Sequence, residues 1–530
     1  MQEPWWRGAT IYQIYPRSFF DSNGDGVGDL PGITARLPYV AALGVDGIWL
    51  SPFFTSPMRD FGYDVANPFE VDPLFGTLAD FDTLLATAHG LGLKVIIDQV
   101  WSHTAAQSAW FQASRSSRSN PHADWYVWAD AKPDGSPPNN WQSWMGGPAW
   151  RWEPRRRQYH LHNFLPEMPD LNFHCPAVQD AVLDLARFWL DRGVDGFRLD
   201  TANLYFHDRL LRDNPPLPEH QRGDSPVLMQ RHLHNADQPE ALAFFERVRE
   251  LLDSYGQRMA VAEVGGSDPT ATMVAYTQGE RRLHTAYSFV LLGAPPGPQA
   301  IAAAVATWQQ GAAAEGWPSW ALSNHDAQRA VSRWAAPPVT LLALLLALRG
   351  TVFLYQGEEL GLPQSTLAYA DLQDPFGKAH WPDHPGRDGC RTPMPWQADA
   401  PHAGFSTHTP WLPADPAHRA LAVDRQLADP HSTWHAARRL IALRREHAAL
   451  RLGRFELLHA DDSLLLLQRV HGPQTLHLAF NLGSSTRQAP TPGHPLRTLF
   501  ATDGAQLLDN QFHLPPGGVI FAAPERLPSP

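Results

Sequence analysis

The sequence predicts an α/β protein built on a TIM (β/α)8 barrel, and three observations support this fold class. Short apolar runs rich in β-branched residues alternate with helical patterns along much of the chain. The runs are almost continuously apolar, which is typical of parallel strands covered on both faces. There are eight of them, the number that closes such a barrel. A doubly wound open sheet is the alternative, but no glycine-rich phosphate turn follows the first strand.

The expected strands are short and separated by helical stretches. They cover residues 10–16, 47–52, 94–100, 196–200, 259–264, 287–292, 319–324 and 351–357. Helical patterns lie between them, for example at 33–44, 78–92, 176–193 and 240–256. The most apolar stretch, 335–348, is shorter than the ~18–20 residues of a membrane span, so we expect a buried helix there.

The alternation is interrupted twice, which predicts three domains. Residues 104–171 are too long for an ordinary loop, so an inserted loop-rich domain is expected after the third strand. Beyond residue 450 the pattern changes to period two with turn residues between the runs, which predicts an antiparallel β-sandwich domain over 451–530. The catalytic barrel would then comprise residues 1–103 and 172–450.

Composition excludes several function classes. The formal net charge of -12 argues against a nucleic-acid partner, which would require a basic surface. The N-terminus has no basic region followed by an apolar run, so we expect no secretory signal and no membrane association. Cys175 and Cys390 are expected to be free thiols. These features favour a soluble, cytoplasmic protein, either a monomer or a homodimer.

Charged side chains gather at the predicted carboxyl ends of the strands, where TIM-barrel active sites lie. They are Asp98, His103, Arg198, Asp200, Glu263, His325 and Asp326. A single acidic residue at a strand end is usually a helix cap or a turn former. Three carboxylates on separate strands, with Arg and His between them, are harder to explain in that way.

Such a group suits double displacement at an acetal carbon. A nucleophilic carboxylate and an acid/base carboxyl about 5–5.5 Å apart would be required. Neighbouring barrel strands lie about 4.8 Å apart, so Asp200 and Glu263 can reach that separation. Arg198 would point to the same side as Asp200 and keep it ionised, whereas the apolar run before Glu263 would raise its pKa.

Several motifs at these positions resemble those of a known family. They are "DQVWSH" (98–103), "GFRLD" (196–200), "AEVGG" (262–266) and "SNHD" (323–326), with "MPDLN" (168–172) and "GEELG" (357–361) as secondary matches. Over almost its whole length the chain resembles the α-amylase family of glycoside hydrolases (family 13), and most closely its α-glucosidase and oligo-1,6-glucosidase branch. The resemblance implies that Asp200 is the nucleophile, Glu263 the general acid/base and Asp326 the transition-state stabiliser.

The resemblance also implies a set of glucose-binding residues. Arg198, His103 and His325 would share the catalytic subsite, and Phe164 would form an aromatic wall. In "DFGYD" (60–64), Tyr63 would provide a stacking platform and Asp60 would hold the outermost glucose. The Arg partner of Asp60 would come from "GRDGCRTPMPW" (386–396), with Arg391 the first choice and Arg387 the second.

Two residues depart from the pattern of the family. Ser102 stands where Asn usually precedes the His of the first motif, and its shorter side chain would weaken the contact that orients the strand end or a calcium ion. Met145 stands where relatives often carry Phe, which changes the expected shape of the pocket rim.

"DSNGDGVGDLPG" (21–32) resembles part of an EF-hand loop, with acidic or amide residues at its first, third and fifth places. The twelfth place holds Gly32 instead of Glu, and a strand is expected before the loop. The resemblance to the branch implies one structural Ca²⁺, or Mg²⁺, held by Asp21, Asn23, Asp25, the Val27 carbonyl and Asp29. A glycine-rich turn without an ion is the alternative. No organic cofactor is expected.

The residue after the predicted nucleophile, Thr201, favours α-1,4 over α-1,6 cleavage by its resemblance to the maltose-active group, and Phe289 would border the same acceptor subsite. We therefore expect an α-glucosidase acting on short α-glucosides, with transglucosylation chemically available. Oligo-1,6-glucosidase, sucrose isomerase and trehalose synthase activities remain open. A barrel metallohydrolase would need a His pair on the first strand, and a catalytically inactive binding module would lack one of the three carboxylates.

Overall fold

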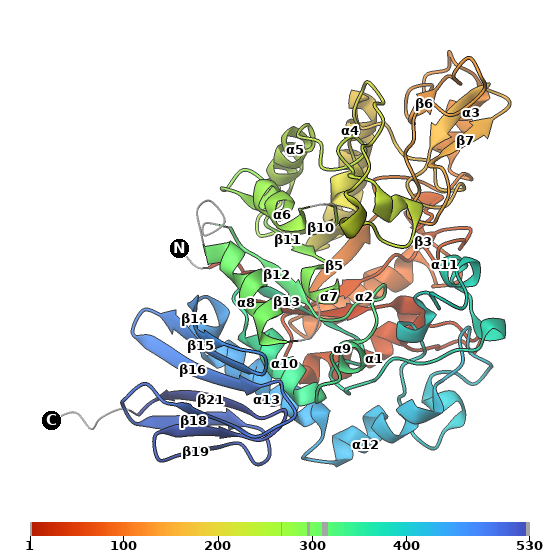
Figure 1. The fold of residues 1–530 in the computed structure, drawn as a ribbon. Coiled ribbons are helices and arrows are strands. Elements are labelled where there is room, and N and C mark those ends of the chain that lie inside the picture. Colours follow the sequence, from red (N-terminus) through yellow and green to blue (C-terminus); the bar gives the residue numbers. More distant parts are fainter. Residues whose placement is uncertain (1–2, 267, 294–296, 310–315, 526–530) are drawn as a thin grey trace.

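The computed structural model describes residues 3–266, 268–293, 297–309 and 316–525 (Figure 1). Eight parallel strands form its central sheet, in the spatial order β11-β10-β9-β5-β2-β1-β13-β12. They are β1 (Thr10–Ile14), β2 (Gly47–Leu50), β5 (Lys94–Gln99), β9 (Gly196–Leu199), β10 (Met259–Val264), β11 (Thr285–Ser288), β12 (Ser319–Ala321) and β13 (Thr351–Tyr355). A parallel bridge between Ala286 and Pro318 joins the two edge strands. The predicted TIM-barrel fold is confirmed.

The apolar strands contribute side chains to two separate cores because successive side chains point to opposite faces of the sheet. Inside the barrel, Ile11, Trp49, Ile96, Val261 and Phe353 pack into one cluster. The side chains on the outer face join a larger cluster beneath the helices. Burial on both faces explains why the strands read as continuous apolar runs.

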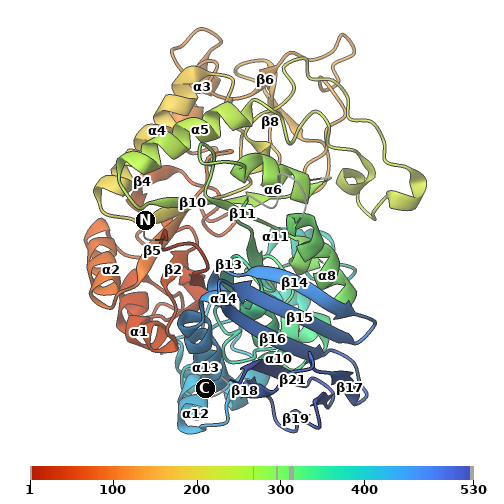
Figure 2. The ribbon, with the colours of Figure 1, turned by 90° about the vertical axis from the view of Figure 1, so that its left-hand side faces the viewer.

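Helices cover the outside of the barrel (Figures 1 and 2). The longer ones are α1 (Leu30–Leu43), α2 (Leu78–Gly90), α4 (Pro176–Asp191), α5 (Ala241–Ser254), α6 (Pro269–Thr277), α8 (Pro298–Ala306), α10 (Pro338–Ala347) and α13 (Thr433–Glu446). Shorter ones are α3 (Ala109–Ser116), α7 (Val290–Gly293), α9 (Ala330–Trp334), α11 (Pro375–Ala379), α12 (Val423–Ala428) and α14 (Ala448–Arg451). A capping box between Thr77 and Asp80 begins α2.

The sixth strand differs from its prediction. We expected it at 287–292, but β11 ends at Ser288 and the helix α7 begins at Val290. The apolar run "YSFVLL" therefore spans the end of a strand and the start of a helix. Periodicity cannot separate a buried strand from a buried helix in so short a run.

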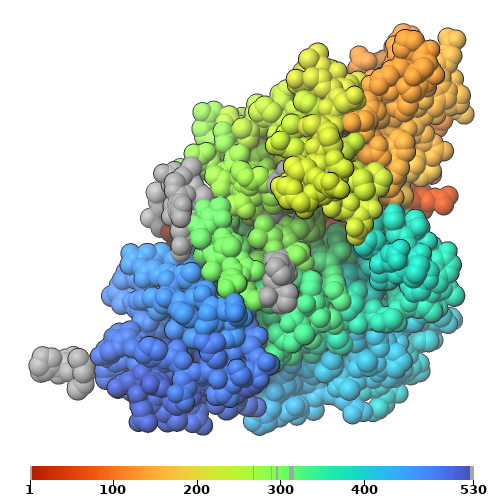
Figure 3. Space-filling view, viewed as in Figure 1, coloured from red at the N-terminus to blue at the C-terminus, as the bar shows by residue number. Residues whose placement is uncertain are grey.

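The inserted segment forms a small body beside the barrel, at the upper right of Figures 1 and 3. Its three-stranded sheet has the order β6-β8-β7, from β6 (Trp128–Ala129), β7 (Trp150–Glu153) and β8 (Gln158–Leu161). Trp141, Trp150 and Leu161 belong to its own core cluster. A bridge between His103 and Asp170 joins the two ends of the insertion at the barrel. A separate hairpin, β3 (Phe54–Thr55) and β4 (Asn67–Val71), follows β2.

The C-terminal part is antiparallel, as predicted. One sheet has the order β14-β15-β16-β21-β18 and the other β17-β20-β19. The strands are β14 (Arg454–Ala460), β15 (Leu464–His471), β16 (Gln474–Asn481), β17 (Arg487–Pro490), β18 (Leu496–Ala501), β19 (Gln506–Leu508), β20 (Gln511–Leu514) and β21 (Val519–Pro524). Leu464, Ile520 and Phe512 pack in a cluster that draws on both sheets. The domain limits at 103, 171 and 450 stay a prediction.

Two further expectations concern single features. Among the described residues, none of the helices has the length and apolarity needed to cross a membrane, and the apolar 335–348 stretch contains the buried ten-residue α10. Cys175 and Cys390 are both free thiols.

A buried arginine on α13 joins the barrel to the C-terminal part of the chain. Arg444 donates to the carbonyls of Leu346 (2.6 Å), Leu348 (2.9 Å) and Gly350 (2.6 Å), which lie at and beyond the C-terminal end of α10. These carbonyls have no helical partner of their own, so the guanidinium satisfies them. Burial lowers the pKa of Arg444 to about 9.

Replacing Arg444 with Met should lower the free energy of unfolding by about 3 kcal/mol, because several buried carbonyls lose their donor. Urea unfolding followed by circular dichroism measures the change. Arg438→Met on the exposed face of the same helix is the matched control and should cost less than about 0.5 kcal/mol. Equal losses in the two variants would contradict this role for Arg444.

Candidate active site

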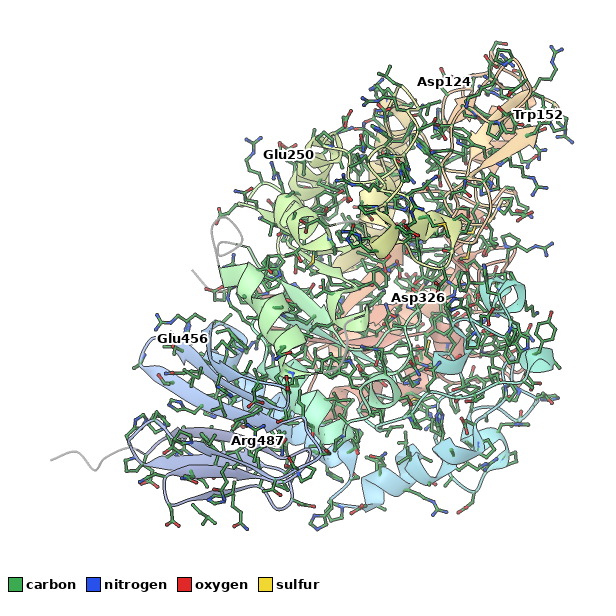
Figure 4. All side chains as sticks on the ribbon, viewed as in Figure 1. Asp124, Trp152, Glu250, Asp326, Glu456 and Arg487 are labelled. Atoms are coloured by element: carbon green, nitrogen blue, oxygen red, sulfur yellow. The ribbon has the colours of Figure 1, made fainter. Side chains whose placement is uncertain are left out.

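The predicted catalytic side chains meet at the carboxyl ends of the barrel strands. Asp200 directly follows β9 and Glu263 lies near the end of β10, where Leu199 pairs with Ala262 in parallel register. Asp326 follows β12, and Figure 4 marks it near the middle of the molecule. A cavity of about 580 Å³ is lined by all three carboxylates and by Asp60, Tyr63, His103, Trp144, Met145, Phe164, Met168, Thr201, Asn203, Leu204, Leu228, Val264, Gly265, Gly266, Pro269, Phe289, Phe376 and Arg387.

The guanidinium of Arg198 contacts the carboxylates of Asp98, Asp200 and Glu263. Arg198 is fully buried, and its Nη1 donates to Asp98 Oδ1 (2.8 Å) and to Asp200 Oδ1 (2.5 Å). Its Nη2 forms an ion pair with Glu263 Oε1. The indole ring of Trp49 lies 5.1 Å from the guanidinium carbon and packs against the cation. The nucleophile and acid candidates therefore face the same cavity from neighbouring strands.

The charge balance at this guanidinium favours one retained proton. Burial raises the pKa of Asp200 and of Glu263 to about 7, although the Arg198 cation opposes the shift in both. One cation cannot offset three buried carboxylate charges, so the group keeps a proton near neutral pH. Arg198 donates to Asp200, and Glu263 accepts from the Thr201 backbone N–H and the Tyr287 hydroxyl in addition to its ion pair with Arg198. Both carboxyls are thus held by donors, and the retained proton belongs to the group as a whole.

Asp326 has a different electrostatic environment. Arg391 Nη2 donates to its Oδ1 at 2.8 Å, and Arg387 Nη1 lies 3.4 Å from the same atom. Burial acts to raise the pKa of Asp326, but the neighbouring His325 ring and the two guanidiniums hold it below its usual range. Asp326 is therefore an anion with free acceptor capacity toward the cavity.

His325 is fixed as a neutral ring. Burial lowers its pKa to about 3. The ring stacks between Tyr15 and Tyr63, with centroid distances of 5.6 and 5.1 Å. Gln13 Nε2 lies 2.8 Å from its Nδ1, and because the amide nitrogen donates, Nδ1 is the acceptor and Nε2 carries the proton.

Arg387, not Arg391, pairs with Asp60. Arg387 Nη2 lies 2.6 Å from Asp60 Oδ1 and 2.8 Å from Asp374 Oδ1. Our first choice, Arg391, is wrong for this pairing because its side chain is directed to Asp326 and to the His325 carbonyl. The Asp60–Arg387 pair is largely buried and lines the cavity.

The remaining predicted residues also line the cavity. The rings of His103 and Phe164 lie 5.3 Å apart, and burial lowers the pKa of His103 to about 4, so the ring is neutral. Tyr63 donates to Asp98 Oδ2 (3.1 Å). Phe289 is 37% exposed and Leu228 is 46% exposed, which places both at the open, apolar end of the cavity. Every predicted substrate residue lines the cavity except Arg198, His325 and Arg391, which contact the lining carboxylates from behind.

Several site residues were missed, and the predicted strands could have identified two of them. Tyr287 pairs with Glu263 in the β10–β11 register. Gln13 lies on β1 and contacts His325. Asp374, which holds Arg387, is the N-cap of the short helix α11 and lies outside the alternating strand pattern.

The site agrees with comparisons to known proteins. A family model described as the α-amylase catalytic domain matches residues 13–453, which is more than four-fifths of the chain. The chain belongs to the α-amylase family. It falls in the α-glucosidase and oligo-1,6-glucosidase branch of this glycoside hydrolase family. A second model, a domain of unknown function (DUF3459), matches residues 450–521.

Relatives of this α-amylase-family chain are similar over nearly their full length. A probable alpha-glucosidase of Rhizobium meliloti is 52% identical and covers 98% of this chain and 97% of the relative. An oligo-1,6-glucosidase of Parageobacillus thermoglucosidasius is 35% identical, with 93% of each chain covered. The solved structure of XgtA, an alpha-glucosyl transfer enzyme, superposes with a TM-score of 0.95 at 52% identity, covering 99% of this chain and 100% of XgtA. A trehalulose synthase, MutB, gives 0.90 at 30% identity, with 98% and 100% covered.

The two departures from the family pattern have specific places. Met145 lines the cavity, and its effect on the shape of the rim stays a prediction. Ser102 forms two side-chain contacts, one to His103 Nδ1 (2.8 Å) and one to Thr201 Oγ1 (2.9 Å). The short side chain therefore still holds the first-motif His, and in addition it reaches the residue after Asp200.

The predicted acid/base carboxyl can be tested through its phenol donor. Tyr287 donates to Glu263 Oε1 (3.1 Å) and so stabilises the ionised form. In Tyr287→Phe the pKa of Glu263 should rise, because the charged form loses a hydrogen bond. The alkaline limb of the kcat/KM profile should then move up by about half to one pH unit.

The control for this experiment is Tyr276→Phe, which makes the same change at a buried phenol whose hydroxyl has no hydrogen-bond partner among the described residues. Its alkaline limb should match that of the wild type. An unchanged or lower alkaline limb in Tyr287→Phe would exclude Glu263 as the proton donor.

Proposed function

We propose that the chain is a retaining α-glucosidase that releases glucose from the non-reducing end of short α-glucosides, with a preference for α-1,4 linkages of the maltose type. The observation that carries the proposal is the pairing of Asp200 and Glu263 with one buried guanidinium, next to a cavity that the Asp60–Arg387 ion pair lines. In this proposal the Asp60–Arg387 pair closes the inner end of the cavity, which admits a chain terminus and excludes an internal segment.

In the first step, Asp200 attacks the anomeric carbon while Glu263 gives its proton to the departing glycosidic oxygen. The C1–O bond breaks, and a glucosyl ester forms on the aspartate. In the second step, Glu263 takes a proton from water, whose oxygen attacks C1 and releases Asp200. Asp326, an anion held by Arg391, accepts hydrogen bonds from sugar hydroxyls throughout.

Two features support the finer parts of the proposal. Thr201 borders the cavity next to the nucleophile, where its resemblance to maltose-active relatives favours α-1,4 linkages. At the open end, the side chains of Met145, Leu228 and Phe289 are apolar. Such a rim offers water few hydrogen bonds, so an acceptor alcohol can compete in the second step and give transglucosylation.

A panel of maltose, isomaltose, sucrose and trehalose tests the function. The purified chain should release glucose fastest from maltose, and chromatography of the products should show new glucosides at high maltose concentration. Faster cleavage of isomaltose would replace the α-1,4 preference with an oligo-1,6-glucosidase activity. Conversion of sucrose to an isomer without net glucose release would identify a sucrose isomerase.

Asp200→Asn tests the mechanism because it keeps the shape and removes the nucleophile. Turnover of maltose should fall by more than about 10³-fold. Asp237→Asn, at a partly buried carboxyl whose pKa burial raises to about 6, is the control and should retain most activity. Near-wild-type turnover in Asp200→Asn would remove Asp200 from this role.

We further propose that the 21–29 loop holds one structural Ca²⁺. Its donors are all oxygens, which suit a hard cation. Asp21 already accepts bonds from the Gly24 (2.7 Å) and Gly26 (2.8 Å) backbone, and Asp25 from Val27 (2.8 Å). Among the described residues, no three His, Cys, Asp or Glu side chains form a ready metal site. The ion would therefore add Asn23 and the Val27 carbonyl and use lone pairs that these hydrogen bonds leave free.

Metal analysis after mild dialysis should find one divalent ion per chain. EDTA should lower the melting temperature of the wild type by several degrees, because a ligand of the native state stabilises it. Asp25→Asn should weaken the effect. A dialysed chain without bound ion and with an unchanged melting temperature in EDTA would leave the glycine-rich turn as the correct interpretation.

A further inference from the structure

Ser102 lies at the centre of a short chain of polar contacts beside the nucleophile. The residue is 2% exposed. Its Oγ lies 2.8 Å from His103 Nδ1 and 2.9 Å from Thr201 Oγ1. Thr201 Oγ1 also lies 3.3 Å from Asp200 Oδ2, the carboxylate oxygen that Arg198 does not contact. The direction in which the Thr201 hydroxyl donates its hydrogen therefore affects Asp200, the proposed nucleophile.

The direction of each hydrogen bond follows from a backbone carbonyl. His103 Nε2 lies 3.2 Å from the Tyr63 carbonyl oxygen, which can only accept, so Nε2 carries the proton. The ring is neutral because burial lowers its pKa to about 4, so Nδ1 is an acceptor. Ser102 must then give its one hydroxyl hydrogen to Nδ1. Toward Thr201, Ser102 Oγ can only accept.

Thr201 consequently has one proton and two acceptors. Ser102 Oγ is the nearer at 2.9 Å, and Asp200 Oδ2 lies 3.3 Å away. The Thr201 backbone is left-handed (φ 43°), which is unusual for a β-branched residue, and its N–H donates to Glu263 Oε2 (3.1 Å). The Thr201 side chain thus contacts Ser102, while the Thr201 backbone N–H donates to Glu263, the proposed acid/base.

We propose that Ser102 is a positioning residue that withholds the hydroxyl proton of Thr201 from the nucleophilic oxygen of Asp200. This inference rests on the proposed function, in which Asp200 attacks the anomeric carbon. A hydrogen bond from Thr201 would stabilise the carboxylate in the ground state and lose that stabilisation as the ester forms. When Thr201 donates its hydroxyl hydrogen to Ser102 Oγ, Asp200 Oδ2 keeps its full nucleophilicity.

A double-mutant cycle tests the proposal on the whole chain. The variants are Ser102→Ala, Thr201→Val and the double variant, and the substrate is 4-nitrophenyl α-glucoside. Its good leaving group needs little help from Glu263, so kcat/KM reports mainly the attack by Asp200. When Thr201 is retained, Ser102→Ala should lower kcat/KM about tenfold, because the freed hydroxyl turns to Asp200.

In the Thr201→Val background the same Ser102→Ala change should cost less than about threefold, because no hydroxyl is present to reach Asp200. The loss of the donor to His103 is common to both backgrounds and cancels in the comparison. Ser102→Thr, which keeps the hydroxyl, should restore kcat/KM to within about threefold of the wild type. Melting curves of all variants show whether each is folded.

Equal losses from Ser102→Ala in the two backgrounds would overturn the proposal, since Ser102 would then act through His103 or through the fold alone. No loss in either background would overturn it as well. A wild-type chain that releases no 4-nitrophenol would overturn the proposed function together with this inference, whereas an active wild type with an additive cycle would overturn only the inference.

Discussion

The whole site depends on one buried cation. Arg198 is fully removed from solvent, and burying a guanidinium is unfavourable unless carboxylates surround it. Asp98, Asp200 and Glu263 supply them from three neighbouring strands. The same contacts that make the buried arginine tolerable hold Asp200 and Glu263 beside each other at the cavity. Barrel geometry is what allows this, since parallel strands deliver their carboxyl ends to a single face.

Much of the fold and part of the site could be predicted because both follow strand periodicity. The three carboxylates lie at or just beyond strand ends, so locating the strands located them. Arg387 and Arg391 could not be separated in this way. They are four residues apart in an irregular segment, and only the three-dimensional path of that segment sends one to Asp60 and the other to Asp326. The sixth strand was misplaced for a related reason: an apolar run carries no mark where a strand becomes a helix.

The C-terminal sheets are attached through polar contacts as well as through apolar packing. Arg469 on β15 donates to the carbonyls of Ala347 and Gly453, and Arg444 lies close by with its own set of carbonyls. Burial is the main cause that lowers the pKa of both, with repulsion from Arg444 adding to the effect on Arg469 and repulsion from Arg451 adding to the effect on Arg444. Among the described residues, the partners recorded for these guanidiniums are backbone carbonyls, so their hydrogen bonds fix position instead of balancing charge.

The proposed function gives the Asp60–Arg387 ion pair a kinetic consequence. When this pair closes the inner end of the cavity, the cleaved sugar must depart by the route through which the next molecule arrives. A newly released monosaccharide then occupies the innermost position until the remainder of the molecule has left. Each encounter would remove one terminal sugar, and the protein would not slide along a polymer.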